Sequence, residues 1–179
     1  MRESSSRMSE MTPKNEMAGT QIDSYSEDDK KSVVAGISDL QEVERTMSDT
    51  RLPGSEVALK YFDHLQKELA EKRGAIFVAR AEGKVIGFIA CMIEHDDTPA
   101  ETSESTTYGY ISDAYVAPEY RGRGVFSELN QKAEEYLTNF PEVKLIRISV
   151  LANNESAVKA YEKSGYKVED IRLSKRVSK

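Results

Sequence analysis

A segment with paired glycines and arginines, residues 115–127, carries the clearest chemical signal in the sequence: YVAPEYRGRGVFS. It lies between a predicted strand and a predicted helix. Gly122 and Gly124 would let the backbone approach a ligand closely. The free N–H groups and partial positive charge of a helix start favour an anion there, and Arg121 and Arg123 add full charges. The segment therefore predicts a pyrophosphate site.

The spacing of these glycines differs from that of two other phosphate-binding motifs. A P-loop requires a Gly-Lys-Ser/Thr ending, and the dinucleotide fingerprint requires three glycines over six residues. The simpler alternative is an ordinary tight turn with a solvated basic face.

A second segment, residues 154–166, has the sequence NESAVKAYEKSGY. Asn153 or Asn154 can cap a helix at its start, and Gly165 can end it. Local physics alone predicts a small amphipathic helix here, on which Tyr161 is a packing residue.

Together the two segments resemble the GCN5-related N-acetyltransferases (GNAT). The first is similar to that family's acetyl-CoA motif, Gln/Arg-x-x-Gly-x-Gly/Ala preceded by V-x-P, with Arg121, Gly124 and Phe126 at the motif positions. The second is similar to another motif of the family, which has Asn, then Ala three residues later, Tyr seven residues later and Gly-Phe at its end. Here Asn154, Ala157, Tyr161 and Gly165 match this motif, and Tyr166 stands in place of the Phe. Phe126 departs from the usual small residue, so its side chain must turn away from the pyrophosphate or narrow the site.

The resemblance implies acetyl-CoA as cosubstrate and assigns contacts to it. Asn154 would contact the cofactor, and the main chain of Tyr115 and Val116 would pair with pantetheine like an added strand. Tyr161 would lie near the thioester sulfur, where a hydroxyl of ordinary pKa near 10 can protonate a departing thiolate. The pyrophosphate would be held by the backbone amides of the first segment: Arg121, Gly122, Arg123, Gly124, Val125, Phe126 and Ser127.

The amine acceptor requires a group that takes its proton, because a primary amine with a pKa near 10.4 is almost wholly protonated at pH 7. In polyamine acetyltransferases of this family the matching strand has Leu-Glu-Asp before two aromatics. Here Asp113 is retained as a candidate catalytic carboxylate, while Ser112 replaces the glutamate. Other carboxylates expected near the cleft are Glu94, Asp96 and Asp97.

The elements that must position these residues follow from apolar periodicity and turn signals. Their order predicts an α/β fold, and with the resemblance a GNAT-type mixed, mostly antiparallel sheet with helices on both faces. Strands are expected at 20–25, 75–80, 85–94, 108–116 and 144–151, with a last strand or pair of strands at 166–177. Helices are expected at 27–47, 57–73, 122–139 and 155–164. Residues 1–19 lack an apolar pattern and are expected to be a disordered tail before a domain at 20–179.

Composition narrows the partners. A net charge of −6 and a pI of about 5.1 argue against nucleic acid and are compatible with a cationic amine. No apolar run approaches the roughly 20 residues of a membrane span. The lone Cys91 lies in an apolar run, as a buried structural thiol would, and fits cytoplasmic residence. The separated His64 and His95 predict no metal site.

The expected function is transfer of an acetyl group from acetyl-CoA to a primary amine, on a small molecule or a peptide. The alternative is an acyl-CoA-binding module with weak or no catalysis, which Ser112 and Phe126 motivate. The sequence leaves the acceptor, and a possible homodimer, open.

Overall fold

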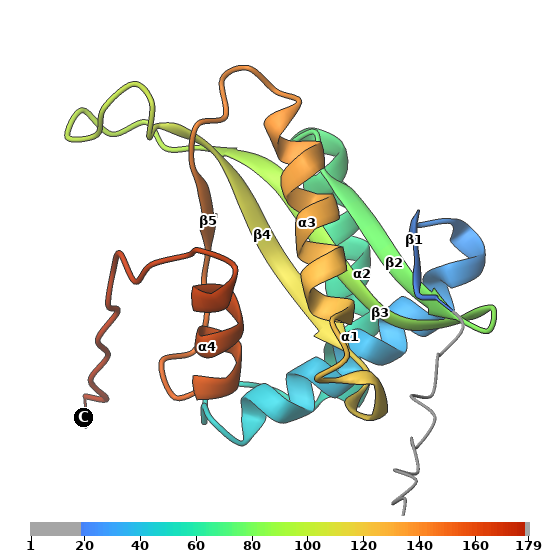
Figure 1. The fold of residues 1–179 in the computed structure, drawn as a ribbon. Coiled ribbons are helices and arrows are strands. Elements are labelled where there is room, and N and C mark those ends of the chain that lie inside the picture. Colours follow the sequence, from blue (N-terminus) through green and yellow to red (C-terminus); the bar gives the residue numbers. More distant parts are fainter. Residues whose placement is uncertain (1–18, 178–179) are drawn as a thin grey trace, which may run out of the picture.

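The computed structural model describes residues 19–177, and the tail expected at 1–19 lies outside them except for Gly19. Within that range the chain forms a mixed sheet with helices on both faces, which confirms the predicted α/β class (Figure 1). The strands are β1 (Gln21–Ser24), β2 (Ala75–Ala81), β3 (Lys84–His95), β4 (Thr107–Val116) and β5 (Ile146–Ile148). The helices are α1 (Lys30–Arg45), α2 (Gly54–Glu71), α3 (Val125–Thr138) and α4 (Glu155–Lys163), with short 3-10 turns at Glu27–Asp29 and Pro118–Tyr120.

The strands follow the order β1-β2-β3-β4-β5, with antiparallel pairing except between β4 and β5, which are parallel. The β2–β3 hairpin turns through Glu82 and Gly83, both with positive φ, as a two-residue primed turn requires. The β3–β4 ladder is interrupted by a register shift between Ala90 and Cys91, which leaves one extra residue on β4, Ser112.

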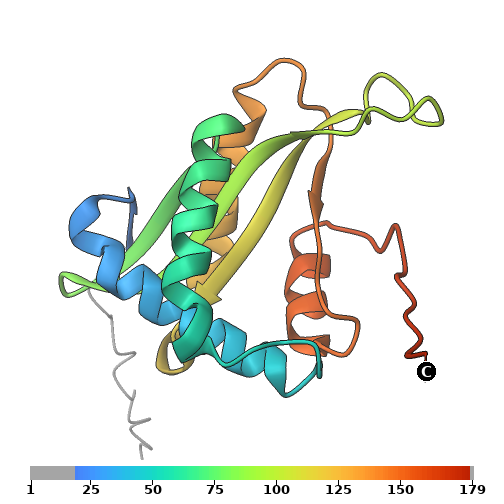
Figure 2. The ribbon, with the colours of Figure 1, turned by 180° about the vertical axis from the view of Figure 1, so that it is seen from behind.

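Both faces of the central strands β2 and β3 are buried, so these two strands are nearly continuous apolar runs. Helix α3 covers one face with Val125, Leu129, Ala133 and Leu137. Helices α1 and α2 cover the other, with core side chains on both helices that include Val33, Ile37, Phe62 and Leu65. Figure 2 shows this second face with α1 and α2 across the sheet.

The sequence predictions differ from the structure at several element ends. The helix expected over 27–47 begins with a 3-10 turn, in which Ser26 and Asp29 form a capping box before α1. The helix expected from Gly122 begins at Val125, because Gly122 and Gly124 adopt left-handed φ values of 73° and 91° that no α-helix contains.

The prediction of a strand at 166–177 was wrong, because these residues form no strand in the structure. A strand needs a neighbour to complete its ladder, and β5, at the sheet edge, is only three residues long. The apolar side chains that suggested a strand are instead exposed, from 68% at Val168 to 89% at Leu173. Among residues 19–177, no helix combines the length and apolarity that crossing a membrane requires.

Candidate active site

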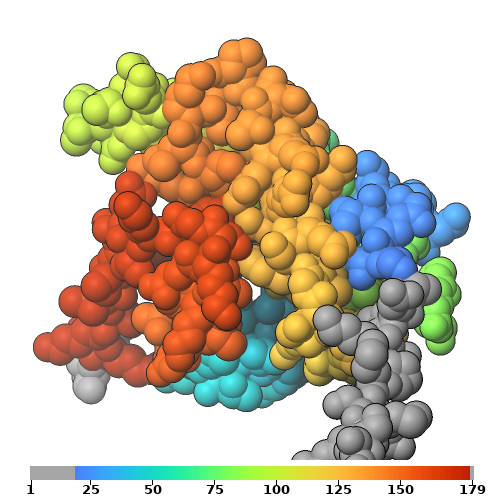
Figure 3. All heavy atoms as spheres, in the orientation of Figure 1, coloured from blue at the N-terminus to red at the C-terminus, as the bar shows by residue number. Residues whose placement is uncertain are grey.

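Strand β5 pairs with only part of β4, and the gap that opens between the two strands beyond this pairing defines the candidate site. The pairing of β4 with β5 covers only Gly109–Ile111, whereas β4 continues to Val116. The β4 edge beyond Ile111 that faces away from β3 therefore has no β5 partner. Figure 1 shows the two strands diverging toward the β4–α3 turn, with α4 beside the gap. Figure 3 shows a recess between α4 (red) and that turn (gold), with the α1–α2 part of the chain (cyan) at its back.

The predicted pyrophosphate segment lies at one rim of this recess as an open turn. A Cβ added to Gly122 or Gly124 would meet no protein atom within 4 Å, so the space over the turn is free for a ligand. The N–H groups in the first turn of α3 have no partner inside the helix. Val125 and Ser127 are the first and third residues of α3, so their backbone amides belong to this first turn.

The two arginines of the turn are exposed and differ in their contacts. The Arg121 Nε donates to the Val116 carbonyl at 2.8 Å, which ties the turn to the end of β4. The Arg123 guanidinium lies 5.7 Å from the centre of the Tyr120 ring. Their charges add to the positive end of α3, so the turn is suited to an anion.

Phe126 turns toward α4. Its ring packs edge-on against Tyr161, with ring centres 5.1 Å apart and planes at 89°. Tyr166 packs against Tyr161 in the same way at 5.6 Å, so the Tyr161 ring is held from two sides. Of the two outcomes expected for the bulky Phe126, the structure shows the side chain directed at Tyr161, with the glycine turn left open.

Tyr161 is 8% exposed, and its buried position raises the pKa of its hydroxyl, with further contributions from nearby Asp113 and Tyr110. The hydroxyl is therefore protonated throughout the physiological range. Within residues 19–177, no group is hydrogen-bonded to it, so its proton is available to a ligand in the recess.

Asp113 lies on the α1–α2 face of the sheet, close enough to Tyr161 to affect its pKa, because of the extra residue on β4. Without the bulge, Ile111 and Asp113 would share one face of the strand. With it, Ile111 pairs with Cys91 and packs under α3, whereas Asp113 pairs with Ala90, whose side chain lies on the α1–α2 face. The bulge thus redirects a carboxylate that would otherwise point into the α3 core.

The carboxylate of Asp113 is nearly buried, at 8% exposed, and accepts the Tyr61 hydroxyl at 2.9 and 3.0 Å. Burial raises its pKa, and nearby Glu44 raises it further, while hydrogen bonds from Ser112 and Tyr61 and the charge of Arg51 act in the opposite direction. A carboxylate with a raised pKa is a better proton acceptor than an ordinary one.

Sequence reasoning did not identify Tyr61 as a site residue, because it lies on α2 in an apolar stripe that predicted only packing. Its contact with Asp113 spans 52 residues. Its hydroxyl pKa is raised by burial and by the adjacent Asp113 charge. The only signal in the sequence was that Tyr61 adds a polar hydroxyl to a stripe of otherwise apolar side chains.

Two residues predicted to contact the cofactor, Asn154 and Tyr115, make structural hydrogen bonds within the protein. Asn154 is the N-cap of α4, where its Oδ1 accepts the Ala157 N–H at 3.2 Å. The Tyr115 hydroxyl donates to Asp39 at 2.7 Å, and burial and this contact raise its pKa. The main chain of Tyr115 and Val116 lies on the part of β4 beyond the β5 pairing.

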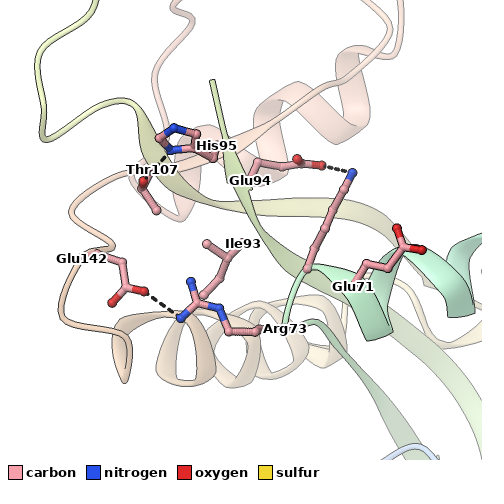
Figure 4. A pocket seen from close by; sticks show the side chains of 8 residues that line it. Glu71, Arg73, Ile93, Glu94, His95, Thr107 and Glu142 are labelled. Atoms are coloured by element: carbon pink, nitrogen blue, oxygen red, sulfur yellow. Dashed lines mark hydrogen bonds and ion pairs between the residues drawn. The ribbon is translucent and has the colours of Figure 1, made fainter. Parts of the chain in front are cut away.

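A second hollow lies at the opposite end of β3 and β4, with a volume of about 480 Å³ (Figure 4). Two ion pairs lie in its lining: Lys72 with Glu94, and Arg73 with Glu142, each at 2.7 Å. Glu94 is opposite Tyr108 on β4, roughly 16 Å along the strand from Asp113. The structure therefore places Glu94 away from the recess, contrary to expectation.

Two further predictions concern cysteine and metal chemistry. Cys91 is fully buried in the α3 core, and burial raises its pKa to about 12, which confirms the structural thiol. The described residues contain no cluster of three His, Cys, Asp or Glu side chains placed to hold a metal ion.

Comparison with known proteins agrees with the fold and the motifs. The chain is 28% identical over 111 residues to an N-acetyltransferase of Methanocaldococcus jannaschii, covering 62% of this chain and 46% of the relative. It is 28% identical over 119 residues to N-alpha-acetyltransferase 30 of Schizosaccharomyces pombe, covering 66% and 70%. The chain thus spans less than half the length of the archaeal relative.

A solved aminoglycoside N-acetyltransferase in complex with CoA has the same fold, with a TM-score of 0.64 at 18% identity, covering 93% of this chain and 99% of that one. The model of the acetyltransferase (GNAT) family matches residues 38–166, which contain α2, most of the sheet and both motif segments. The chain therefore belongs to the acetyltransferase (GNAT) family.

Proposed function

We propose that this protein transfers an acetyl group from acetyl-CoA to a primary amine of a small molecule or a peptide. The observation that carries the proposal is the convergence of three features on one recess: the open glycine turn, the hydroxyl of Tyr161 and the carboxylate of Asp113. Family membership supports the cosubstrate and the amine acceptor.

The described residues fit acetyl-CoA. The turn at Gly122 and Gly124 has room for a pyrophosphate, because an added Cβ at either glycine would meet no protein atom within 4 Å. The β4 edge at Tyr115 and Val116 lies beyond the β5 pairing, where an extended pantetheine chain could add its own hydrogen bonds as a strand would. Together they would direct the thioester toward Tyr161.

Asp113 would take one proton from the acceptor ammonium, so that the neutral amine can attack the thioester carbonyl. As the new C–N bond forms and the C–S bond breaks, Tyr161 would give its proton to the sulfur. The nitrogen releases two protons in all: one reaches solvent from Asp113, and the other restores the hydroxyl of Tyr161. The products are an amide and CoA thiol.

The cofactor assignment is tested by ligand-induced stabilisation. Acetyl-CoA at 100 times its Kd should stabilise the wild type by about 2.7 kcal/mol. Gly124→Val should abolish this gain, because a branched side chain would occupy the open turn at a left-handed φ of 91°.

The matched control is Gly83→Val, in the β2–β3 turn. Gly83 also has a positive φ, 75°, and open space around its Cβ position, but it lies outside the recess. Both variants should lose similar intrinsic stability, while only Gly83→Val keeps the gain with acetyl-CoA. Loss of the gain in both, or in neither, would refute the assignment.

Turnover is tested by thiol release from acetyl-CoA across polyamines, aminoglycosides, amino acids and peptides. An enzyme should release thiol with at least one of these amines, and mass spectrometry should detect the acetylated amine. A protein that binds acetyl-CoA and shows no release with any of these amines would be the binding module that the sequence left open.

A further inference from the structure

The hydroxyl of Tyr61 is the direct hydrogen-bond partner that α2 supplies to Asp113. It reaches both carboxylate oxygens, at 3.0 and 2.9 Å. Asp113 is 8% exposed, while Tyr61 is 37% exposed. The nearly buried carboxylate is therefore in direct contact with a side chain that is itself partly exposed to solvent.

The groups that face Asp113 come from every neighbouring element. Helix α1 contributes Glu44 and the α1–α2 connection contributes Arg51, which pair with each other at 2.8 Å. Strand β4 contributes Ser112, and on α4 the hydroxyl of Tyr161 is within electrostatic range. Because Arg51 is partly neutralised by Glu44, the hydroxyls are the main groups that can stabilise a negative charge on Asp113.

We propose that Tyr61 is a positioning residue that holds Asp113 ionised and aimed into the recess, ready to take the proton of the acceptor ammonium. This inference rests on the proposed function, in which Asp113 is the proton acceptor. A hydroxyl that donates to a carboxylate stabilises its charged form and fixes the direction of its lone pairs. Tyr61 itself gives up no proton.

The hydrogen bond from Tyr61 determines the direction in which its removal shifts the pKa of Asp113. Burial raises the pKa of Asp113, and the hydrogen bond from Tyr61 counteracts that rise. Tyr61→Phe keeps the ring and removes the donor, so the pKa of Asp113 should rise further. The protonated, inactive form would then persist to higher pH.

The experiment measures kcat/KM for the best acceptor against pH, in the wild type and in Tyr61→Phe. The acid limb of the profile should move up by about one to two pH units, the shift expected when a hydrogen bond to a charged group is lost. At pH values below the acid limb of the wild type, the rate of Tyr61→Phe should be roughly 10- to 100-fold lower than that of the wild type, and above the shifted limb the two rates should converge. The KM for acetyl-CoA should not change.

Tyr136→Phe is the matched control, because it also removes a tyrosine hydroxyl with a 3.0 Å hydrogen bond, to the Arg73 carbonyl away from the recess. Its pH profile should match that of the wild type. An unshifted acid limb in Tyr61→Phe, in a protein that still unfolds cooperatively, would overturn the inference.

Asp113→Asn separates this inference from the proposed function. If Asp113→Asn abolishes transfer while Tyr61→Phe leaves the acid limb in place, Asp113 remains the proton acceptor and Tyr61 has no positioning role. If Asp113→Asn retains full activity, the proposed role of Asp113 fails, and the inference fails with it.

Discussion

Tyr161→Phe should separate catalysis from packing, because the structure assigns the ring and the hydroxyl of Tyr161 to different tasks. The ring packs edge-on against Phe126 and Tyr166, at 5.1 and 5.6 Å, and phenylalanine retains both contacts. The hydroxyl has no hydrogen bond within residues 19–177. Its removal should therefore cost less than the roughly 0.5–1.5 kcal/mol that one hydrogen bond contributes to stability.

The chemical step should respond much more strongly. A positioned acid contributes roughly 10²–10⁴-fold to a rate, which corresponds to about 3–5 kcal/mol of activation free energy. The effect should lie toward the lower end, because a thiolate whose conjugate thiol has a pKa near 8.5 is already a tolerable leaving group.

The assay is single-turnover acetyl transfer with the best acceptor, together with chemical unfolding of each variant. Tyr166→Phe is the matched control, since its hydroxyl donates to Glu134 at 2.9 Å. Tyr166→Phe should lose about 1 kcal/mol of stability and keep the wild-type transfer rate. Tyr161→Phe should instead keep most of its stability and lose transfer rate. Rates for wild type and Tyr161→Phe that agree within a factor of two would show that Tyr161 only packs.

Three other predictions concern an aromatic contact, a buried ion pair and the N-terminal segment. Phe126→Ala should slow single-turnover transfer roughly two- to tenfold, the worth of one aromatic contact, and should cause no further loss when Tyr161 is already phenylalanine. Asp29→Ala should cost about 3 kcal/mol in urea unfolding, because it breaks the buried 2.8 Å pair with Arg80, whereas the exposed Asp28→Ala should cost little. Burial would raise the pKa of Asp29, but hydrogen bonds from Ser26 and Arg80 outweigh it and lower the pKa; its contribution to stability is thus present above about pH 4 and lost as pH falls further. Deletion of residues 1–18 should leave the melting temperature and turnover unchanged, since that segment has no apolar pattern, and a large loss of either would contradict this.

Local sequence determined the elements with strong periodicity or punctuation. Apolar spacing located α2 and α3, and the glycine turn at 122–124 was recognisable because a left-handed backbone strongly favours that residue type. The spacing of Asn154 and Tyr161 placed both on one helix. Local sequence predicted the strands near the C-terminus less well. Strand β5 is shorter than predicted, and the segment after Tyr166 forms no strand, because pairing depends on a neighbour that local sequence does not specify.

The surroundings of the candidate catalytic groups were decided only by the tertiary structure. A one-residue bulge on β4 turns Asp113 toward α2, and a bulge depends on the register of two strands. The contact between Tyr61 and Asp113 joins residues 52 positions apart, and the pairing of Phe126 with Tyr161 joins two helices. Sequence spacing reports neighbours along one element, whereas these contacts depend on how separate elements pack, so residue types could propose the chemistry but not its arrangement.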